Sequence, residues 1–357
     1  MRIVITGATG NLGTSLMRSL EMDSTVQRVV GLARRPPPMV TDKLRFVRTD
    51  VSIDDLEARF RGADAVVHLA WRVQPARDEA LLYRANVTGS YRVLQAAARA
   101  RVPALVCASS VGAYARGSKE RRVDESWPVT GIPTSIYSRQ KAILERMLDR
   151  LERECPRMRV VRARPALVFK RGAASGIRRY FLGPWVPGFI FRSSRIPVVP
   201  DVERLRFQVL HSHDAGEALR RMVLSDVHGA FNLAAEPVVD AMLLGTVLGA
   251  RRVPVPARWL RVGVQWAYRL HLMPTHRGWV DLALGMPLMS TERAYRELGF
   301  EPRHSAADLL LELLEGIHDG AGMPTPPLWT EGGDPRAQPV RGSEVRRRND
   351  LEGARLR

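Results

Sequence analysis

The chain has 357 residues, 45% of them hydrophobic, which is enough to bury a substantial core in one large domain or two smaller ones. Its two cysteines are too few for a disulfide framework, and no apolar run reaches the roughly 18 residues of a membrane-spanning helix, so we expect a cytoplasmic protein without a signal peptide or transmembrane segment. The formal charge of +18 comes almost entirely from arginines spread along the chain, without a nucleic-acid-binding signature. We therefore expect a general attraction for anions and no nucleic-acid partner.

The first 170 residues alternate short apolar strands with helical patterns. This alternation predicts an α/β fold, a Rossmann-type doubly wound parallel sheet with helices on both faces. The expected strands are Arg2–Ile5, Arg28–Ala33, Arg45–Arg48, Ala65–Leu69, Ala104–Ser109 and Arg159–Val168, and the expected helices include Asn11–Glu21, Leu81–Ala100 and Ile136–Glu154. In such a sheet, ligands bind at the carboxyl ends of the strands.

The pattern changes after Lys170. Gly, Pro and aromatic residues dominate 171–205, Arg206–His211 and Phe231–Ala234 are expected as strands, and Asp214 with Glu217 matches a helix N-cap and its capping partner. We expect three parts: a dinucleotide-binding domain of 1–170 plus about 206–236, a smaller C-terminal substrate-binding region of 171–205 and a helical 237–317, and a disordered tail at 318–357.

A glycine-rich turn directly follows the first strand and opens the first helix. Gly7 permits a backbone turn that most residues cannot adopt, Gly10 allows close approach of a pyrophosphate, and Gly13 lets the helix lie against the strand. Free N–H groups at the start of the helix attract an anion. The turn therefore predicts a dinucleotide-phosphate site. Its other members are Thr9, Asn11 and Leu12.

Tyr137 and Lys141 lie four residues apart in an expected helix, so their side chains share one face. A phenol with its ordinary pKa of about 10 is a poor acid or base at neutral pH, but a neighbouring ammonium stabilises the phenolate and lowers that pKa. The pair is therefore a candidate proton shuttle, although this spacing also occurs by chance in many helices. Ser110 follows an apolar strand, where its hydroxyl is expected in the same strand-end crevice, and Ser109 is the less favoured alternative.

In this order, the glycine turn, Ser110, Tyr137 and Lys141 resemble the extended short-chain dehydrogenase/reductase family, of the NAD-dependent epimerase/dehydratase type. The resemblance covers roughly residues 1–316 and includes several lesser motifs. They are Asp50-Val51, His68-Leu69-Ala70 followed by Trp71 in place of a usually small residue, Asn86-Val-Thr-Gly89, and Arg164-Pro165-Ala166-Leu167-Val168.

The resemblance implies a mechanism and a set of site residues. Tyr137 would move a proton to or from a substrate oxygen while hydride passes between substrate and nicotinamide. Lys141 would lower the pKa of Tyr137 and bond the nicotinamide ribose, and Ser110 would orient the substrate oxygen. Asn86 would support the active-site helix. The further cofactor contacts that the resemblance implies are Asp50 and Val51 at the adenine, and Leu69, Ala70, Trp71, Pro165, Leu167 and Val168 beside the rest of the cofactor.

The choice of cofactor rests on the end of the second strand. An NAD site generally has an Asp or Glu there, which accepts a hydrogen bond from the ribose 2′-OH. Here that position is Ala33, and Arg34 and Arg35 follow it. Two arginines can grip a 2′-phosphate, so we favour NADP over NAD, while two solvated loop arginines remain the alternative interpretation.

Three functions are compatible with these motifs. We favour an NAD(P)-dependent oxidoreductase that acts on a carbonyl or secondary alcohol, with a partly hydrophobic small-molecule substrate. A sugar-nucleotide epimerase with tightly bound NAD is the first alternative, and a non-catalytic NADP-binding sensor is the second. A dehydratase is disfavoured because Val111-Gly112, and no acidic pair, follows Ser110.

The family resemblance also implies a homodimer, formed through the helices at 81–100 and 136–154. Within Arg258–His271, arginines lie opposite Trp259, Val262 and Trp266, which predicts a helix packed over the substrate site or, less favoured, a helix at a membrane surface. We expect no metal at His211-Ser-His213-Asp214, because the capping interpretation explains that segment better.

Overall fold

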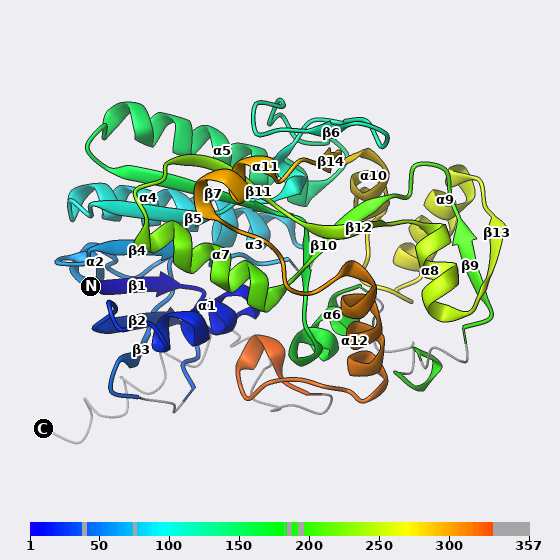
Figure 1. The fold of residues 1–357 in the computed structure, drawn as a ribbon, viewed down its shortest axis with the longest axis horizontal. Helices are drawn as coiled ribbons and strands as arrows, with labels where there is room; N and C mark the ends of the chain where they lie inside the picture. Colours follow the sequence, from blue (N-terminus) through cyan, green and yellow to red (C-terminus); the bar gives the residue numbers. More distant parts are fainter. Residues whose placement is uncertain (38–40, 74–76, 182, 184–187, 192–195, 331–357) are drawn as a thin grey trace, which may run out of the picture.

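The computed structural model of the chain describes residues 1–37, 41–73, 77–181, 183, 188–191 and 196–330. The strands of the central sheet run away from the N-terminus of the chain, and most of the later elements gather beyond their carboxyl ends (Figure 1). The part of the expected insertion at Pro184-Trp185 and the part of the expected tail at 331–357 lie outside the described residues.

Seven parallel strands form the central sheet, in the order β11-β7-β5-β4-β1-β2-β3. They are β1 (Arg2–Thr6), β2 (Arg28–Ala33), β3 (Leu44–Arg48), β4 (Ala65–His68), β5 (Ala104–Ala108), β7 (Arg159–Pro165) and β11 (Gly229–Leu233). The chain starts in the middle of the sheet, runs outward to β3, and then returns to add β4 on the other side of β1. The order therefore reverses between β1 and β4, where such sheets bind their ligands. The predicted Rossmann-type sheet is confirmed.

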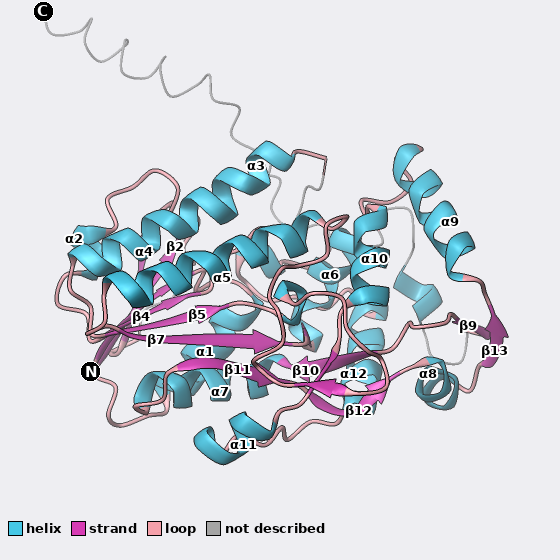
Figure 2. Cartoon of the chain, turned by 90° about the horizontal axis from the view of Figure 1, so that it is seen from above, coloured by secondary structure: helices cyan, strands magenta, loops and turns pink. Residues whose placement is uncertain are grey.

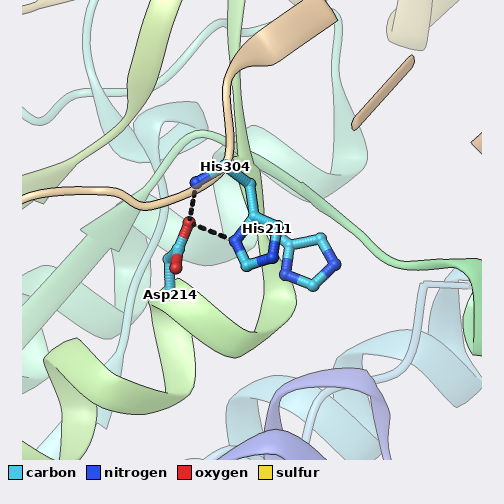
Figure 3. A group of neighbouring side chains, drawn as sticks. All are labelled: His211, Asp214 and His304. Atoms are coloured by element: carbon cyan, nitrogen blue, oxygen red, sulfur yellow. Dashed lines mark hydrogen bonds and ion pairs between the residues drawn. The ribbon is translucent and has the colours of Figure 1, made fainter. Parts of the chain in front are cut away.

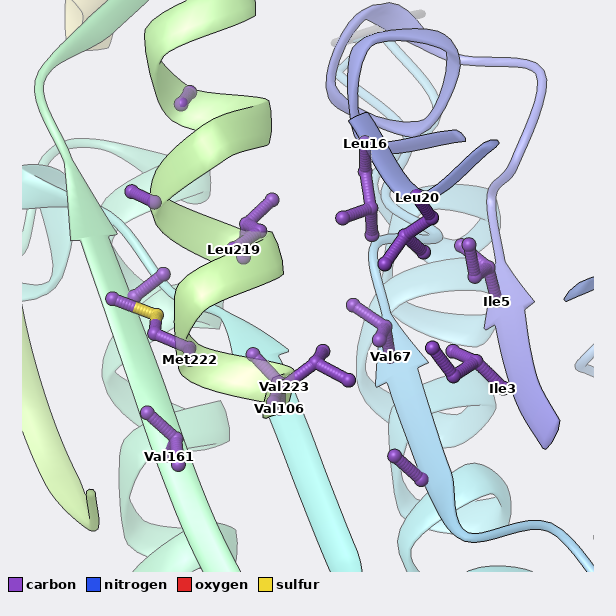
Figure 4. Packing of buried hydrophobic residues seen from close by; sticks show 14 of the residues in the cluster. Ile3, Ile5, Leu16, Leu20, Val67, Val106, Val161, Leu219, Met222 and Val223 are labelled. Carbon is purple, nitrogen blue, oxygen red and sulfur yellow. The ribbon is translucent and has the colours of Figure 1, made fainter. Parts of the chain in front are cut away.

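Helices cover both faces of this sheet (Figure 2). On one face lie α1 (Asn11–Glu21) and α7 (Ser212–Leu224), and on the other lie α2 (Glu57–Phe60), α4 (Gly89–Arg99) and α5 (Ile136–Glu154). Figure 4 shows the first interface: Leu16 and Leu20 of α1 and Leu219 of α7 point at the apolar side chains of the strands. Each such fully buried aliphatic side chain contributes about 1.5–3 kcal/mol. This packing holds the strand ends in a rigid frame.

The remaining elements extend the molecule past the strand ends (Figure 1). Three strands form a second sheet, β8 (Leu167–Phe169), β10 (Phe207–His211) and β12 (Ala235–Val239), and two pairs are β9 (Val198–Asp201) with β13 (Arg251–Pro254) and β6 (Arg122–Val123) with β14 (Leu288–Met289). The helices are α6 (Ala174–Phe181), α8 (Ala241–Leu248), α9 (Ala257–Arg269), α10 (Arg277–Gly285), α11 (Glu292–Leu298) and α12 (Ala306–His318). The stretch expected to be helical from 237 to 317 thus also contains strand residues.

Two expected elements are divided in the structure. The helix expected at 81–100 consists of α3 (Glu79–Tyr83), a π-helical turn at Arg84–Thr88, and α4. The strand expected at 159–168 is interrupted at Ala166, so β7 belongs to the central sheet and β8 to the second sheet. Both interruptions lie next to residues that the family resemblance assigns to the site.

The predicted N-cap at Asp214 is wrong. The α7 helix begins at Ser212, and the side chain of His211 caps it by accepting from the His213 backbone N–H. Asp214 Oδ2 instead accepts from the backbone N–H groups of Arg303 and His304, because its position in the first turn faces that loop. Among the described residues, none of the helices is long and apolar enough to cross a membrane.

Candidate active site

The glycine turn between β1 and α1 is closely packed against the backbone around it. Gly7 has φ +71°, and a Cβ atom there would lie 2.6 Å from the Ala70 backbone nitrogen. A Cβ on Gly13 would lie 2.4 Å from the Gly7 carbonyl oxygen. A side chain at either position would clash with the backbone, so the packing of the turn against the segment after β4, and of α1 against the turn, requires these two glycines.

Neighbouring residues hold this turn against the second sheet. Asn11 Nδ2 donates to the Val168 carbonyl at 2.9 Å, and the Ser212 hydroxyl donates to Asn11 Oδ1 at 2.7 Å. Leu12 packs on the core, and Thr9 is buried. Asn11 therefore joins the glycine turn to β8, which carries Leu167 and Val168, while Pro165 ends β7 beside Leu233.

Positive charge lies just beyond the carboxyl end of β2. Arg34 and Arg35 are exposed directly after the buried Ala33. Asp50 lies near them, and its Oδ1 accepts from the backbone and hydroxyl of Ser52, at 2.9 and 2.6 Å. Val51, the other residue expected at the adenine, lies close to Gly89 of α4.

Arg72 is a candidate cofactor residue that the sequence did not indicate. It follows Trp71 after β4, and its half-buried side chain interacts electrostatically with Arg34 and Asp50. Burial first, and then the positive charge of Arg34, lower the pKa of its guanidinium. Within the described residues, its Nε atom is buried without a hydrogen-bond partner. A buried, unpaired guanidinium nitrogen fits an anionic ligand, but one arginine in so arginine-rich a chain gave no signal of this.

Ser110 and Tyr137 meet at the carboxyl end of β5. Ser110 caps the 3-10 turn Val111–Ala113, and its hydroxyl accepts from the Gly112 N–H at 3.0 Å. The side chains of Ser110 and Tyr137 both lie beside Gly112, and a Cβ atom there would be 3.4 Å from Ser110 Oγ. Burial raises the pKa of Tyr137, and the Ser110 hydroxyl opposes the rise. A Cβ on Gly112 would lie 2.8 Å from the Tyr137 ring, so this glycine is needed for the contact.

Lys141 lies one helical turn after Tyr137 and points toward the same strand end. Its Nζ donates to the Ala108 carbonyl at 2.8 Å and lies 3.6 Å from the centre of the Trp71 ring. The same atom is 5.9 Å from the centre of the Tyr137 ring. Burial lowers the pKa of Lys141 to about 8. Trp71, the departure from the family pattern, thus provides an aromatic face for the ammonium.

Asn86 lies in the π-helical turn before α4 and connects three elements. Its Oδ1 accepts from the backbone N–H of Arg72 at 2.7 Å, and its Nδ2 donates to the Arg72 carbonyl at 2.8 Å. The same Nδ2 also donates to Gln140 Oε1 on α5 at 2.8 Å. Asn86 therefore fixes the segment after β4 against the active-site helix, and π turns are frequent at such positions.

Ser109 has a structural partner behind the site. Its hydroxyl donates to Glu145 Oε1 at 2.5 Å, and the fully buried Glu145 also accepts from Arg164 at 2.8 and 2.9 Å. Desolvation by burial favours the neutral acid, but the hydrogen bonds from Arg164 and Ser109 and the charges of Arg164 and Arg162 together lower the pKa of Glu145, so it is a carboxylate. Glu145 lies one turn beyond Lys141 on α5. The ion pair therefore anchors this helix to β7 beneath the site.

Aromatic side chains from the C-terminal region cover Tyr137. The Trp279 ring of α10 lies 5.1 Å from the Tyr137 ring, and Phe181 of α6 lies 5.0 Å from Trp279. Asn86, Gln140, His276 and Trp279 help to line a small cavity beside Tyr137. Polar and apolar side chains share its walls, so the cavity offers apolar contact together with groups that can orient a substrate.

The segment after α12 reaches back to the glycine turn. The Thr325 hydroxyl donates to the Thr9 carbonyl at 3.0 Å, and Thr325 is buried. Trp329 lies 5.7 Å from the Arg35 guanidinium, and its carbonyl accepts from Arg179 at 2.8 Å. The segment was expected to belong to the tail, and no local pattern indicated these contacts.

A cluster of His211, Asp214 and His304 lies where β10 ends and α7 begins (Figure 3). Their ligand atoms lie within 4.8 Å of one another, as a metal site would require. However, the rings of His211 and His304 stack at 3.8 Å, and Asp214 Oδ2 accepts from His304 Nδ1 at 3.0 Å. His211 uses Nδ1 for its helix and Nε2 for Glu312, 3.3 Å away. The arrangement therefore fits a structural role, in which these contacts hold the start of α7 against the loop before α12.

Comparison with known proteins supplies the family. Residues 3–234 match the NAD dependent epimerase/dehydratase family. The chain belongs to this family. The matched region contains the glycine turn, Ser110, Tyr137 and Lys141, so the predicted resemblance is confirmed.

The relatives of this epimerase/dehydratase chain include proteins of several kinds. An uncharacterized protein of Mycobacterium tuberculosis is 28% identical over 327 residues, which are 90% of this chain but 31% of that protein. The chain thus spans about a third of the length of that relative. A protein of Stigmatella aurantiaca, named 4-hydroxy-2-methyl-3-oxo-4-farnesyl-3,4-dihydroquinoline-1-oxide ketoreductase, is 28% identical over 180 residues, or 47% of this chain and 51% of that protein.

Solved structures agree on the fold. The UDP-glucose 4-epimerase of Thermus thermophilus, in complex with NAD, has a TM-score of 0.64 and 20% identity over 89% of this chain and 99% of that one. The likeness supports the Rossmann-type architecture of this family member.

Proposed function

We propose that this chain is an NADP-dependent oxidoreductase that interconverts a carbonyl and a secondary alcohol on a small, partly hydrophobic substrate. The observation that carries the proposal is that Ser110 and Tyr137 lie together beside Gly112, at the carboxyl end of β5, with Lys141 one turn away on α5. The apolar wall formed by Trp279 and Phe181 supports a hydrophobic substrate. The ketoreductase among the relatives supports the reaction class.

In the proposed reaction, the protein's own side chains would transfer the proton and orient the substrate. A bound nicotinamide supplies or accepts hydride. Tyr137 donates its phenolic proton to the substrate oxygen during reduction and takes it back during oxidation. Ser110 orients that oxygen, and Lys141, protonated below about pH 8, stabilises the phenolate by its charge. Asn86 holds the segment after β4 against α5 through its hydrogen bonds to the Arg72 backbone and to Gln140.

The preference for NADP rests on arginines. Ala33 offers no carboxylate for a ribose 2′-OH, while Arg34 and Arg35 follow it and Arg72 lies close to both. Three guanidinium groups close to one another favour the binding of a phosphate group. The glycine turn and the unpaired Nε of Arg72 fit a dinucleotide, and we propose that Gly7, Gly10 and Asn11 hold its pyrophosphate. NAD, present in the complex of the Thermus epimerase, is the alternative.

The identity of the bound nucleotide tests this proposal. The purified full chain is denatured, released nucleotide is identified by mass spectrometry, and binding of NADPH and NADH is titrated on undenatured protein. We expect little retained nucleotide, tighter binding of NADPH, and loss of that preference in Arg34→Ala/Arg35→Ala. The matched control Arg59→Ala/Arg61→Ala, at the distant α2 helix, should keep it.

Other outcomes identify the alternatives. Stoichiometric retained NAD would contradict the proposal and favour a sugar-nucleotide epimerase, which regenerates its cofactor in each cycle. If NADPH binds reversibly but is not oxidised when any member of a panel of apolar ketones, quinones and aldehydes is added, a non-catalytic NADP sensor would be favoured.

We also propose a homodimer through α4 and α5, as the family resemblance implies. Sedimentation equilibrium measures it directly.

A further inference from the structure

The α9 helix exposes an unusually apolar surface. Its outer face consists of Trp259, Val262, Trp266 and Leu270, which caps the helix, and these side chains are 60%, 45%, 56% and 61% exposed. None of the helix residues is buried. Spacings of three or four residues place the four side chains along one stripe. Single exposed apolar residues are common, but two tryptophans in one stripe mark an interaction surface.

The opposite face of α9 is attached to the protein. Leu260 and Val264 pack against a buried cluster that includes Val280, and Arg261 pairs with Asp281 of α10 at 2.7 Å. At the end of the helix, the Arg77 guanidinium lies 4.0 Å from the centre of the Tyr268 ring. The favoured expectation, that Trp259 and Trp266 pack over the substrate site, is therefore wrong. The side of α9 that carries Leu260 and Val264 packs against the rest of the protein, and the tryptophans face outward.

The segment that contains α9 carries charge of one sign. Residues 241–280 contain six arginines and no aspartate, glutamate or lysine. Arg258 and Arg269 lie over the rings of Trp259 and Trp266, at 5.7 and 5.8 Å from the ring centres. Both arginines are exposed. The cationic groups therefore stand immediately beside the apolar stripe, and the expectation that Arg258 and Arg269 lie opposite the tryptophans is wrong.

Further positive charge lies at the same end of the molecule. The β13 strand, which leads into α9, exposes Arg251 and Arg252, the latter in a loose pair with Asp201 at 3.8 Å. In Figures 1 and 2, α8, α9, β9 and β13 lie together at the end beyond the strand ends. The apolar stripe and its arginines thus form one prominent surface.

We propose that the α9 outer face docks on the surface of an anionic lipid bilayer. Tryptophan prefers the boundary between acyl chains and headgroups, and flanking arginines attract anionic headgroups. A second copy fits less well, because a twofold contact through α9 would place Arg258 and Arg269 of both copies in one interface without carboxylates from this segment. The helix lies parallel to the bilayer, with the aromatic rings at the depth of the headgroups.

Co-sedimentation with vesicles tests this docking. The full chain is mixed with vesicles of equal parts phosphatidylglycerol and phosphatidylcholine, or of phosphatidylcholine alone. We expect binding to the anionic vesicles only, weakened by salt, and quenching of tryptophan fluorescence by brominated lipid. Trp259→Ser/Trp266→Ser should weaken binding by at least about tenfold. Arg258→Gln/Arg269→Gln should weaken it by about fivefold for each arginine removed.

A matched control removes exposed aromatic residues elsewhere. Trp127 and Tyr295 are 37% and 60% exposed and lie outside this surface, so Trp127→Ser/Tyr295→Ser should bind vesicles like the unmodified chain. All variants should unfold at the same denaturant concentration, since the α9 outer face makes no buried contact. Equal binding by the α9 variants and the control would overturn the proposal. So would an oligomer, measured without lipid, that only Trp259→Ser/Trp266→Ser dissociates, because the face would then join two copies.

Discussion

The central sheet and the α9 end use arginine in opposite ways. Arg164, buried in β7, meets the buried Glu145 of α5 in a two-point ion pair that joins the helix to the sheet. Arg258 and Arg269 stand exposed over tryptophan rings, in a segment without carboxylates. The same residue type stabilises a rigid site in one region and is available to an external anion in the other. We therefore expect substitutions in the sheet region to affect chemistry and stability, and substitutions at the periphery to affect binding.

The largest effect is expected from Tyr137→Phe. Loss of the phenolic hydroxyl removes the proposed acid and base, so kcat should fall by roughly 10²–10⁴-fold. Binding of NADPH, measured by fluorescence titration, should change little. Tyr83→Phe, at a half-exposed tyrosine on α3, is the matched control and should keep full activity. Unchanged turnover in Tyr137→Phe would show that another group moves the proton.

The next effect concerns stability. Glu145→Leu leaves the guanidinium of Arg164 buried without its carboxylate, which should cost about 3–5 kcal/mol in the free energy of unfolding. Urea unfolding measures this loss. Glu154→Leu, which removes an exposed pair with Arg150, should cost far less. Similar losses in both variants would contradict the distinction between buried and peripheral arginines.

The pH dependence of reduction depends on Lys141. Its ammonium is charged below its pKa of about 8 and loses its proton as the pH rises through that value. The phenolate formed on Tyr137 then loses its stabilising charge, so kcat/KM for reduction should decline above about pH 8. In Lys141→Arg the guanidinium stays charged, and the decline should move to higher pH. If the decline stays in place in Lys141→Arg, a different group causes it.

The smallest effect, on cofactor binding, is expected where the segment after α12 contacts the glycine turn. Thr325→Val removes the hydrogen bond to the Thr9 carbonyl, which contributes about 1 kcal/mol. The dissociation constant of the cofactor should rise by at most about fivefold, without a change in kcat. Thr246→Val, which removes a hydroxyl bonded within the distant α8 helix, is the control. A loss of kcat in Thr325→Val would mean that the periphery also positions the catalytic groups.

Local patterns predicted the part of the protein that depends on local geometry. Alternating strands and helices indicated the parallel sheet, because burial on both faces requires apolar strands and amphipathic helices. The spacing of Tyr137 and Lys141 placed both on one face of α5, and the structure keeps them there. The glycine turn predicted a backbone that excludes side chains, and Gly7 and Gly13 indeed have no room for one.

Tertiary structure decided what local patterns leave open. The capping prediction for Asp214 failed because its carboxylate found the distant backbone of Arg303 and His304 instead of its own helix. Thr325 reaches Thr9 across most of the chain, and no pattern in either neighbourhood encodes such a contact.

The sequence of α9 determined that the helix has two unlike faces, but not which of them the protein covers. That choice depended on whether Leu260, Val264 and Arg261 or the two tryptophans met a complementary surface, and Val280 and Asp281 supplied one to the first set. An amphipathic period is a property of the chain alone. The side that becomes buried is a property of the neighbours that folding brings to it.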